Sequence, residues 1–281
     1  MNTFKRTAGN VSAIAVNSFR EGVRDRILYV IVVFAVAVIA SGKVIGWVSV
    51  GEDIKVVRDI GLTAMSLFGV LVAVFVGANL IHREIERHTI YTVLARPVGR
   101  GEFIVGRYLG LLGLVVLVTA AMGVFFTLYQ AVLVWAGAEG LSGVEGGVFP
   151  VALLRCEFLI VFQFVMLVAL AVFFSSATTP ILSAVFTFVA YVLGHMAGWI
   201  YQFSYMVIDK PHAAIADKVI SYGLRAFYYL VPNLETFDMR LRAVHGLDIS
   251  NGEFFLILTY GVLYTVMVML GAWLVIRRRE L

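Results

Sequence analysis

The residues Gly101–Tyr108, with the sequence GEFIVGRY, come close to a phosphate-binding loop. That loop has the pattern G-x-x-x-x-G-K-[ST], in which the lysine contacts phosphates and the hydroxyl binds magnesium. Here Arg107 stands in place of the lysine and Tyr108 in place of the hydroxyl residue. The segment also opens a long apolar run and follows no strand. We therefore expect ATP chemistry, if the protein uses it, to belong to a partner, and we expect no cofactor in this chain.

Other catalytic patterns do not occur in the sequence. It contains no H-E-x-x-H for a metalloprotease and no G-x-S-x-G for a serine hydrolase. The five histidines are scattered, and Cys156 is the only cysteine, so an internal disulfide cannot form. A haem protein needs paired axial ligands within the membrane, and the spacing of the histidines offers none. The sequence predicts a protein that is not itself an enzyme.

Two polar residues lie inside long apolar runs and are the candidates for a substrate path, namely His195 and Gln163. An ionisable residue within a membrane segment is a functional hypothesis by default. However, His195 lies between Gly194 and Gly198, whose spacing of four suits close helix packing. A histidine bonded locally at a packed site is the other interpretation. We expect Gln163 to form a hydrogen bond between helices.

The composition points to lipid as the solvent. The chain is 61% hydrophobic and 14% charged over 281 residues, whereas a soluble domain carries about 25% charge. The basic balance has a topological explanation, because membrane proteins collect lysine and arginine on the cytoplasmic side. We therefore expect no nucleic-acid partner. The fold class predicted is an all-α, polytopic membrane protein.

Six membrane spans can be counted from runs of about 20 apolar residues. The run Phe158–Ile208 is too long for one span, and Pro180 after a Ser/Thr cluster disfavours helix at Thr179, so we divide it there. The expected spans are 27–46, 62–81, a part of 108–138, 158–175, 180–201 and 254–276.

The distribution of charge supports this count. With the N-terminus in the cytoplasm, the cytoplasmic pieces hold 13 of the 22 lysines and arginines but 6 of the 18 acidic residues. A total of five or seven spans would place the terminal RRRE sequence outside, against the positive-inside rule. We predict both termini in the cytoplasm.

Two further segments have an amphipathic pattern. Residues 10–26 place Val11, Ile14 and Phe19 on one helical face and charges on the other, which is typical of a helix in the membrane interface. The alternative is a continuation of the first span. Residues 202–252 mix apolar, aromatic and charged residues, and we expect short helices near the outer leaflet. Arg155 is expected either to pair with this outer segment or to reach the lipid surface.

The segment 82–107 is far more charged than the runs on either side of it. It holds five arginines, three glutamates and two histidines. Spacings such as that from Glu84 to His88 permit ion pairs on a helix. Pro97 and two glycines predict a sharp turn before a new helix. The mixture of acidic, basic and apolar residues fits a surface that docks onto another protein; a solvated charged loop is equally consistent with it.

The chain resembles the permease subunits of ABC transporters of the ABC-2 type. In that family this loop reads approximately E-x-E-x-x-T-x-x-x-x-L-x-x-P-x-x-R, followed by Gly-Lys or Gly-Arg. The matching residues are Glu84, Glu86, Thr89, Leu94, Pro97, Arg100, Gly106 and Arg107. His88 departs from the pattern, which often has glycine there. The resemblance extends to AIAVNSFREGVRDRILY before the first span and to LVPNLETF before the last.

The resemblance implies a single transmembrane permease domain over residues 1–281 in a bacterial cytoplasmic membrane. Segment 82–107 would be a coupling helix in a groove of a separate ATPase subunit, which binds ATP and magnesium. Its expected interface residues are Arg83, Glu84, Glu86, Arg87, Thr89, Leu94, Arg96, Pro97 and Arg100. Arg100 and Arg107 could instead anchor to lipid phosphate.

The expected working unit pairs this chain with a second copy and two ATPase subunits, as an exporter whose substrate the sequence does not reveal. The alternative is a complex that transmits ATP-driven motion to outer partners, with an accessory protein on segment 202–252, and moves no solute.

Overall fold

The structure is a computed structural model and describes residues 2–46, 53–86, 99–135, 151–208 and 215–278. All regular elements in these ranges are helices, which confirms the all-α prediction. In chain order they are α1 (Asn2–Val23), α2 (Arg26–Gly46), α3 (Asp53–Glu86), α5 (Arg100–Trp135), α6 (Val151–Ala177), α7 (Pro180–His195), α8 (Ala197–Ile208), α9 (Ile215–Leu230), the short 3-10 helix η1 (Glu235–Phe237), α10 (Arg240–Val244) and α11 (Asn251–Arg278).

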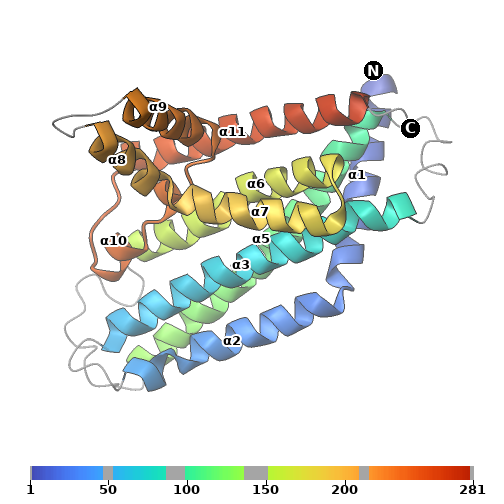
Figure 1. Cartoon of the computed structure of the whole chain (residues 1–281). Helices are drawn as coiled ribbons and strands as arrows, with labels where there is room; N and C mark the ends of the chain where they lie inside the picture. The colour runs from blue at the N-terminus through green and yellow to red at the C-terminus, as the bar shows by residue number, and fades with distance from the viewer. Residues whose placement is uncertain (1, 47–52, 87–98, 136–150, 209–214, 279–281) are drawn as a thin grey trace.

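The long helices run side by side and give the molecule two distinct ends (Figure 1). One end carries α1, the end of α3, the start of α5, the turn between α6 and α7, and the end of α11. The other end carries α8, α9 and α10. We refer to these as the α1 end and the α9 end. On the topology predicted above, the α1 end is cytoplasmic.

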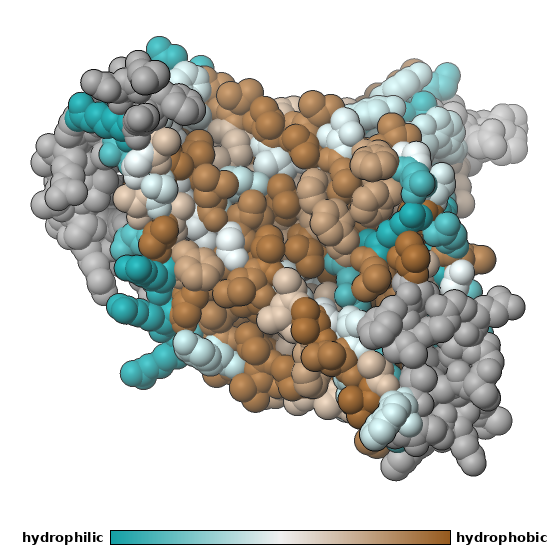
Figure 2. Space-filling view, turned by 180° about the vertical axis from the view of Figure 1, so that it is seen from behind, coloured by the Kyte–Doolittle hydropathy of each residue, from teal (hydrophilic) through white to brown (hydrophobic). Residues whose placement is uncertain are grey.

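Among the described residues, five helices are long and apolar enough to cross a membrane, namely α2, α3, α5, α6 and α11, and the bent pair α7 and α8 is a sixth candidate. Seen from behind, a broad hydrophobic band separates two ends where hydrophilic residues gather (Figure 2). The turn at Pro180 lies where the sequence predicted it, because α6 ends at Ala177 and α7 begins with the proline at its first turn.

The second span begins earlier than the sequence predicted. We expected it at residue 62, because Arg58 and Asp59 interrupt the apolar run. In the structure α3 begins at Asp53, and Arg58 is buried at 3% exposure. Its Nε donates a hydrogen bond to Oε1 of Gln130 in α5, at 3.1 Å. This partner satisfies one donor of the buried guanidinium and favours its inclusion in the helix.

The fifth span is broken at Met196, which the sequence did not predict. The helices α7 and α8 meet there at 61°. The close approach of Gly194 and Gly198 is made to the loop after α9, whereas we expected another membrane helix. Leu234 donates its backbone N–H to the carbonyl of Gly194, at 3.0 Å, and Gly198 donates its own to Glu235 Oε2, at 2.8 Å.

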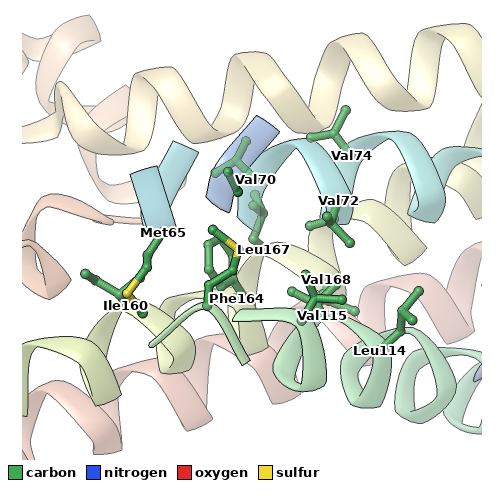
Figure 3. Packing of buried hydrophobic residues seen from close by; sticks show 14 of the residues in the cluster. Met65, Val70, Val72, Val74, Leu114, Val115, Ile160, Phe164, Leu167 and Val168 are labelled. Atoms are coloured by element: carbon green, nitrogen blue, oxygen red, sulfur yellow. The ribbon is translucent and has the colours of Figure 1, made fainter. Parts of the chain in front are cut away.

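The core lies between α3, α5 and α6 (Figure 3). Met65 and Val72 of α3, Leu114 of α5, and Phe164 and Leu167 of α6 are fully buried. A Cβ at Gly69 would lie 2.4 Å from the Phe164 ring, so only glycine allows α3 and α6 to come this close. The interior of one copy is therefore filled by side chains of its own helices.

Candidate functional site

Four of the expected ATPase-interface residues belong to helices that end or begin at the α1 end. Arg83, Glu84 and Glu86 belong to the last turn of α3, and their side chains are outside the described part of the structure. Arg87, Thr89, Leu94, Arg96 and Pro97 also lie outside the described residues. Arg100 begins α5 and donates from Nη1 to the carbonyl of Arg277 in α11, at 3.0 Å. The contact joins the start of α5 to the last turn of α11.

The start of α5 is capped by a side chain of its own first turn. Glu102 Oε2 accepts hydrogen bonds from the backbone N–H of Gly99, at 3.2 Å, and from Nδ2 of Asn10 in α1, at 2.9 Å. A carboxylate at a helix N-terminus satisfies free N–H groups and is favoured by the helix dipole. The same group therefore fixes both the beginning of α5 and its contact with α1.

The N-terminal helix packs along the first third of α5. It extends over Asn2–Val23, longer than the predicted 10–26, and a break at residues 24–25 separates it from α2, so it is not a continuation of the first span. A Cβ at Gly106 would lie 2.7 Å from Ile14 Cβ, and one at Gly110 would lie 2.5 Å from the Ala15 carbonyl and from Ser18 Cβ. Two glycines four apart thus let α1 pack closely against α5.

Arg107 lies in this contact between α1 and α5. Its side chain is 1% exposed, its Nη1 is 3.7 Å from Glu21 Oε2 in α1, and its guanidinium lies 5.4 Å from the Phe103 ring centroid. Our expectation that Arg107 could anchor to lipid phosphate was wrong, because the helix α1 covers it. Burying an arginine is costly without a partner, and Glu21 supplies the opposite charge.

The two candidates for a substrate path meet at Tyr191, through different atoms of that residue. Gln163 Nε2 in α6 donates to Ser66 Oγ in α3, at 3.2 Å, and Ser66 Oγ lies 3.0 Å from the Tyr191 hydroxyl of α7. His195 Nδ1 lies 3.1 Å from the Tyr191 carbonyl, and the two rings are 4.3 Å apart. The bond expected between Gln163 and another helix is confirmed, and so is the local bond of His195.

A second polar group, made of Asp238, Arg240 and Thr63, lies at the α9 end. Arg240 of α10 forms two hydrogen bonds to Asp238, at 2.7 and 2.5 Å, and its Nη1 donates to Thr63 Oγ1 of α3, at 2.9 Å. Burial would raise the pKa of Asp238, but the bonds and charge of Arg240 outweigh it and lower that pKa below its usual range. The Asp238 bonds also raise the pKa of Arg240. This pair ties the loop before α11 to the bundle.

Arg155 pairs with the outer segment, which was one of two expectations for it. Its Nη1 lies 3.1 Å from Asp248 Oδ1, and its Nη2 donates to Asn251 Oδ1, at 2.7 Å. Its neighbour Glu157 lies beside α5, where its Oε1 is 3.1 Å from the hydroxyl of Thr127. The arginine therefore holds the start of α11 against α6.

The comparison with protein families decides the identity of this architecture. The model of the family described as "ABC-2 family transporter protein" matches residues 12–277. The chain belongs to this family. The match takes in α1 from Ser12 onward, both polar groups and the whole of the last span apart from its final residue. A search of curated proteins gave no match.

Membership gives the protein its general role. It is a multi-pass membrane protein and a permease subunit of an ABC transporter, and its family implies an ATP-hydrolysing partner subunit and a lipid bilayer. ABC-2 membrane subunits are transport components and are generally not catalytic themselves. The resemblance stated from Glu84 to Arg107 is therefore confirmed at the level of the family.

Proposed function

We propose that this ABC-2 permease is an exporter subunit that works as a homodimer, with segment 82–107 docked on a separate ATPase subunit that binds ATP and magnesium. Residues 1–281 act as one transmembrane domain in a bacterial cytoplasmic membrane, with both termini in the cytoplasm. Closure of the ATPase pair would move the two coupling segments and switch the path between the two permeases.

The lengths of α3 and α5 carry this proposal. The uncharged run of α3 ends at Ile81, and the helix continues to Glu86, about 8 Å further at 1.5 Å per residue. The helix α5 begins at Arg100 at the same end of the molecule (Figure 1). One helix thus ends and the next begins at this end of the molecule, and the segment that joins them mixes charged and apolar residues in its sequence.

The packing of α1 on α5 supports coupling. A force on the start of α5 acts directly on α1 through the Asn10–Glu102 bond and the Arg107–Glu21 pair. The two helices are in close contact at Gly106 and Gly110, because a Cβ at either glycine would lie within 3.0 Å of α1 atoms. We infer that α1 and the start of α5 move as one body when the ATPase subunit moves.

The packed interior supports a path between two copies. Side chains of α3, α5 and α6 fill the centre of the bundle (Figure 3), and Gln163 within it is 2% exposed. A solute crossing one copy would have to separate these helices. His195 and Gln163 would contact substrate only if the Ser66–Tyr191 bond opened during the transport cycle.

The second candidate function is the transmission of motion to an outer partner. One observation favours it: α9 leaves several large apolar side chains exposed, Ile215, Val219 and Tyr222 among them. An accessory protein could cover this face, as could the outer surface of the membrane. The two functions share the ATPase contact and differ in whether a solute crosses.

The first experiment is purification of the tagged permease from its host in mild detergent, with ATPase activity assayed on the eluate. The coupling proposal predicts a co-purifying nucleotide-binding subunit that Glu84→Lys removes. The control is Lys218→Glu, which changes charge by two units in the opposite direction on an exposed position of α9. A permease that stays monodisperse and retains the ATPase subunit with Glu84→Lys would contradict the proposal.

A further inference from the structure

A groove at the α9 end is lined by aromatic side chains that the transport proposal does not use. It has a volume of about 830 Å3 and runs between the end of α9, the loop after it and the outer half of α11. Four tyrosines line it, Tyr228 and Tyr229 of α9 and Tyr260 and Tyr264 of α11. Tyrosine rings present a negative face, which attracts organic cations.

The described lining of the groove holds an acidic side chain and no basic one. The Oδ1 atom of Asn233 is buried in its wall and accepts no hydrogen bond from the described residues. Glu253 lines the mouth, and its carboxylate is 2.7 Å from Arg242 Nη1. Arg242 does not line the groove, and as far as the structure describes the lining it includes no lysine or arginine. The surfaces that a ligand would touch are therefore mostly aromatic and apolar, and Glu253 is the charged side chain of the described lining.

The groove changes character along its length. Its mouth is at Gly252 and Glu253, and its far end is at Met267, about 22 Å along α11 at 1.5 Å per residue. Between them lie Leu256 and Ile257 on the same helix. Leu256 is 72% and Met267 is 57% exposed, so this part opens on the hydrophobic band. A ligand that matches has a polar head at the α9 end and an alkyl chain along α11.

We propose that this groove binds an amphiphile with a quaternary ammonium head, the head among Tyr228, Tyr229 and Asn233 and the chain along α11. Aromatic rings and a nearby carboxylate recognise such a head without needing a hydrogen-bond donor from it. The chain gains stability from apolar burial against Leu256 and Met267. The proposal does not depend on the direction of transport or on the ATPase contact.

The test uses the full-length permease in nanodiscs and a photoreactive dodecyltrimethylammonium probe, with labelled peptides identified by mass spectrometry. Saturable labelling of α9 and α11 is expected, competed by unlabelled dodecyltrimethylammonium and not by dodecyl sulfate, which has the same chain and the opposite charge. Competition by dodecylphosphocholine as well would identify the source as a choline lipid; competition by the cation alone would identify a free cationic amphiphile.

Variants at one exposed ring separate binding from folding. Tyr229 is 74% exposed and forms its aromatic contact with Tyr228. Tyr229→Leu should weaken binding by about two- to five-fold, whereas Tyr229→Phe, which keeps a ring, should bind nearly as well as the wild type. The control is Tyr222→Leu, an exposed tyrosine of α9 that does not line the groove.

The proposal is overturned by any of three results. Dodecyl sulfate could compete as well as the cation, Tyr229→Leu and Tyr229→Phe could bind alike, or Tyr222→Leu could lose as much as Tyr229→Leu. Each would show that the probe partitions into the bilayer without recognition by the rings. A failed ATPase pull-down would leave these outcomes unchanged, so the two proposals fail separately.

Discussion

Arg107 of α5 lies 3.7 Å from Glu21 of α1, in a contact where the arginine is 1% exposed. The pair lies at the α1 end, and Arg107 stands between Gly106 and Gly110, the two glycines on which α1 packs against α5. It joins the first helix of the chain to the helix that leaves the proposed coupling segment. The predictions below begin with this contact.

Removing the carboxylate should destabilise the permease. Glu21→Gln leaves the buried guanidinium without its opposite charge, and we expect a loss of about 1–3 kcal/mol in stability. Thermal unfolding in detergent measures it. The exchanged pair Glu21→Arg with Arg107→Glu should recover part of the loss. A Glu21→Gln variant that unfolds at the wild-type temperature would show that this pair contributes nothing.

Bulk at the helix crossing should release α1 from α5. A Cβ at Gly110 would lie 2.5 Å from two atoms of α1, whereas one at Gly113 would lie 3.6 Å from Phe19, in ordinary contact. We therefore expect Gly110→Val to make α1 sensitive to protease and Gly113→Ala to leave it protected. Equal protection of both variants would contradict the close packing.

These two contacts also show what the sequence could not provide. The amphipathic pattern of residues 10–26 predicted a separate helix, since periodicity is a local property. It could not show which surface the helix meets, and so lipid phosphate was one of the contacts considered for Arg107. The start of α3 and the break at Met196 were missed for the same reason. Each depends on a partner distant in sequence, Gln130 for Arg58 and Leu234 for Gly194.

The site was predictable in part. The pattern from Glu84 to Arg107 was sufficient for the family, because it is a spacing of residue types within one segment. Gln163 and His195 were identified as polar residues in apolar runs. Their link through Ser66 and Tyr191 could not be predicted, since it joins α3, α6 and α7. The groove of four tyrosines also brings together two helices separated by a loop.

The buried hydrogen-bond chain should contribute to stability. Gln163→Leu removes the donor to Ser66, and Tyr191→Phe removes the hydroxyl on its other side. We expect a loss of about 1 kcal/mol for each, because each takes away a typical buried hydrogen bond. Gln202→Leu, at an exposed position of α8, is the control. If the Gln163 and Ser66 side chains were independent, the variants Gln163→Leu and Ser66→Ala would show additive losses.

The stability conferred by Asp238 should depend on acid pH. Because its folded pKa is lowered by Arg240, its contribution is complete above the ordinary aspartate pKa of about 3.9 and is lost as pH falls through the folded value. The thermal midpoint of wild type should therefore fall more steeply below about pH 4 than that of Asp238→Asn. Parallel curves for the two proteins from pH 6 to pH 3 would contradict the pairing.

The central claim is that segment 82–107 touches the ATPase subunit, and the most direct measurement is site-specific photo-cross-linking in the host membrane. A photoreactive amino acid is placed at Leu94, and in a second strain at Trp199, which is 70% exposed in α8 at the α9 end. The account predicts an adduct of the permease with the ATPase subunit from position 94 and none from position 199. An adduct from position 199 alone, or from neither position in a complex that still hydrolyses ATP, would contradict it.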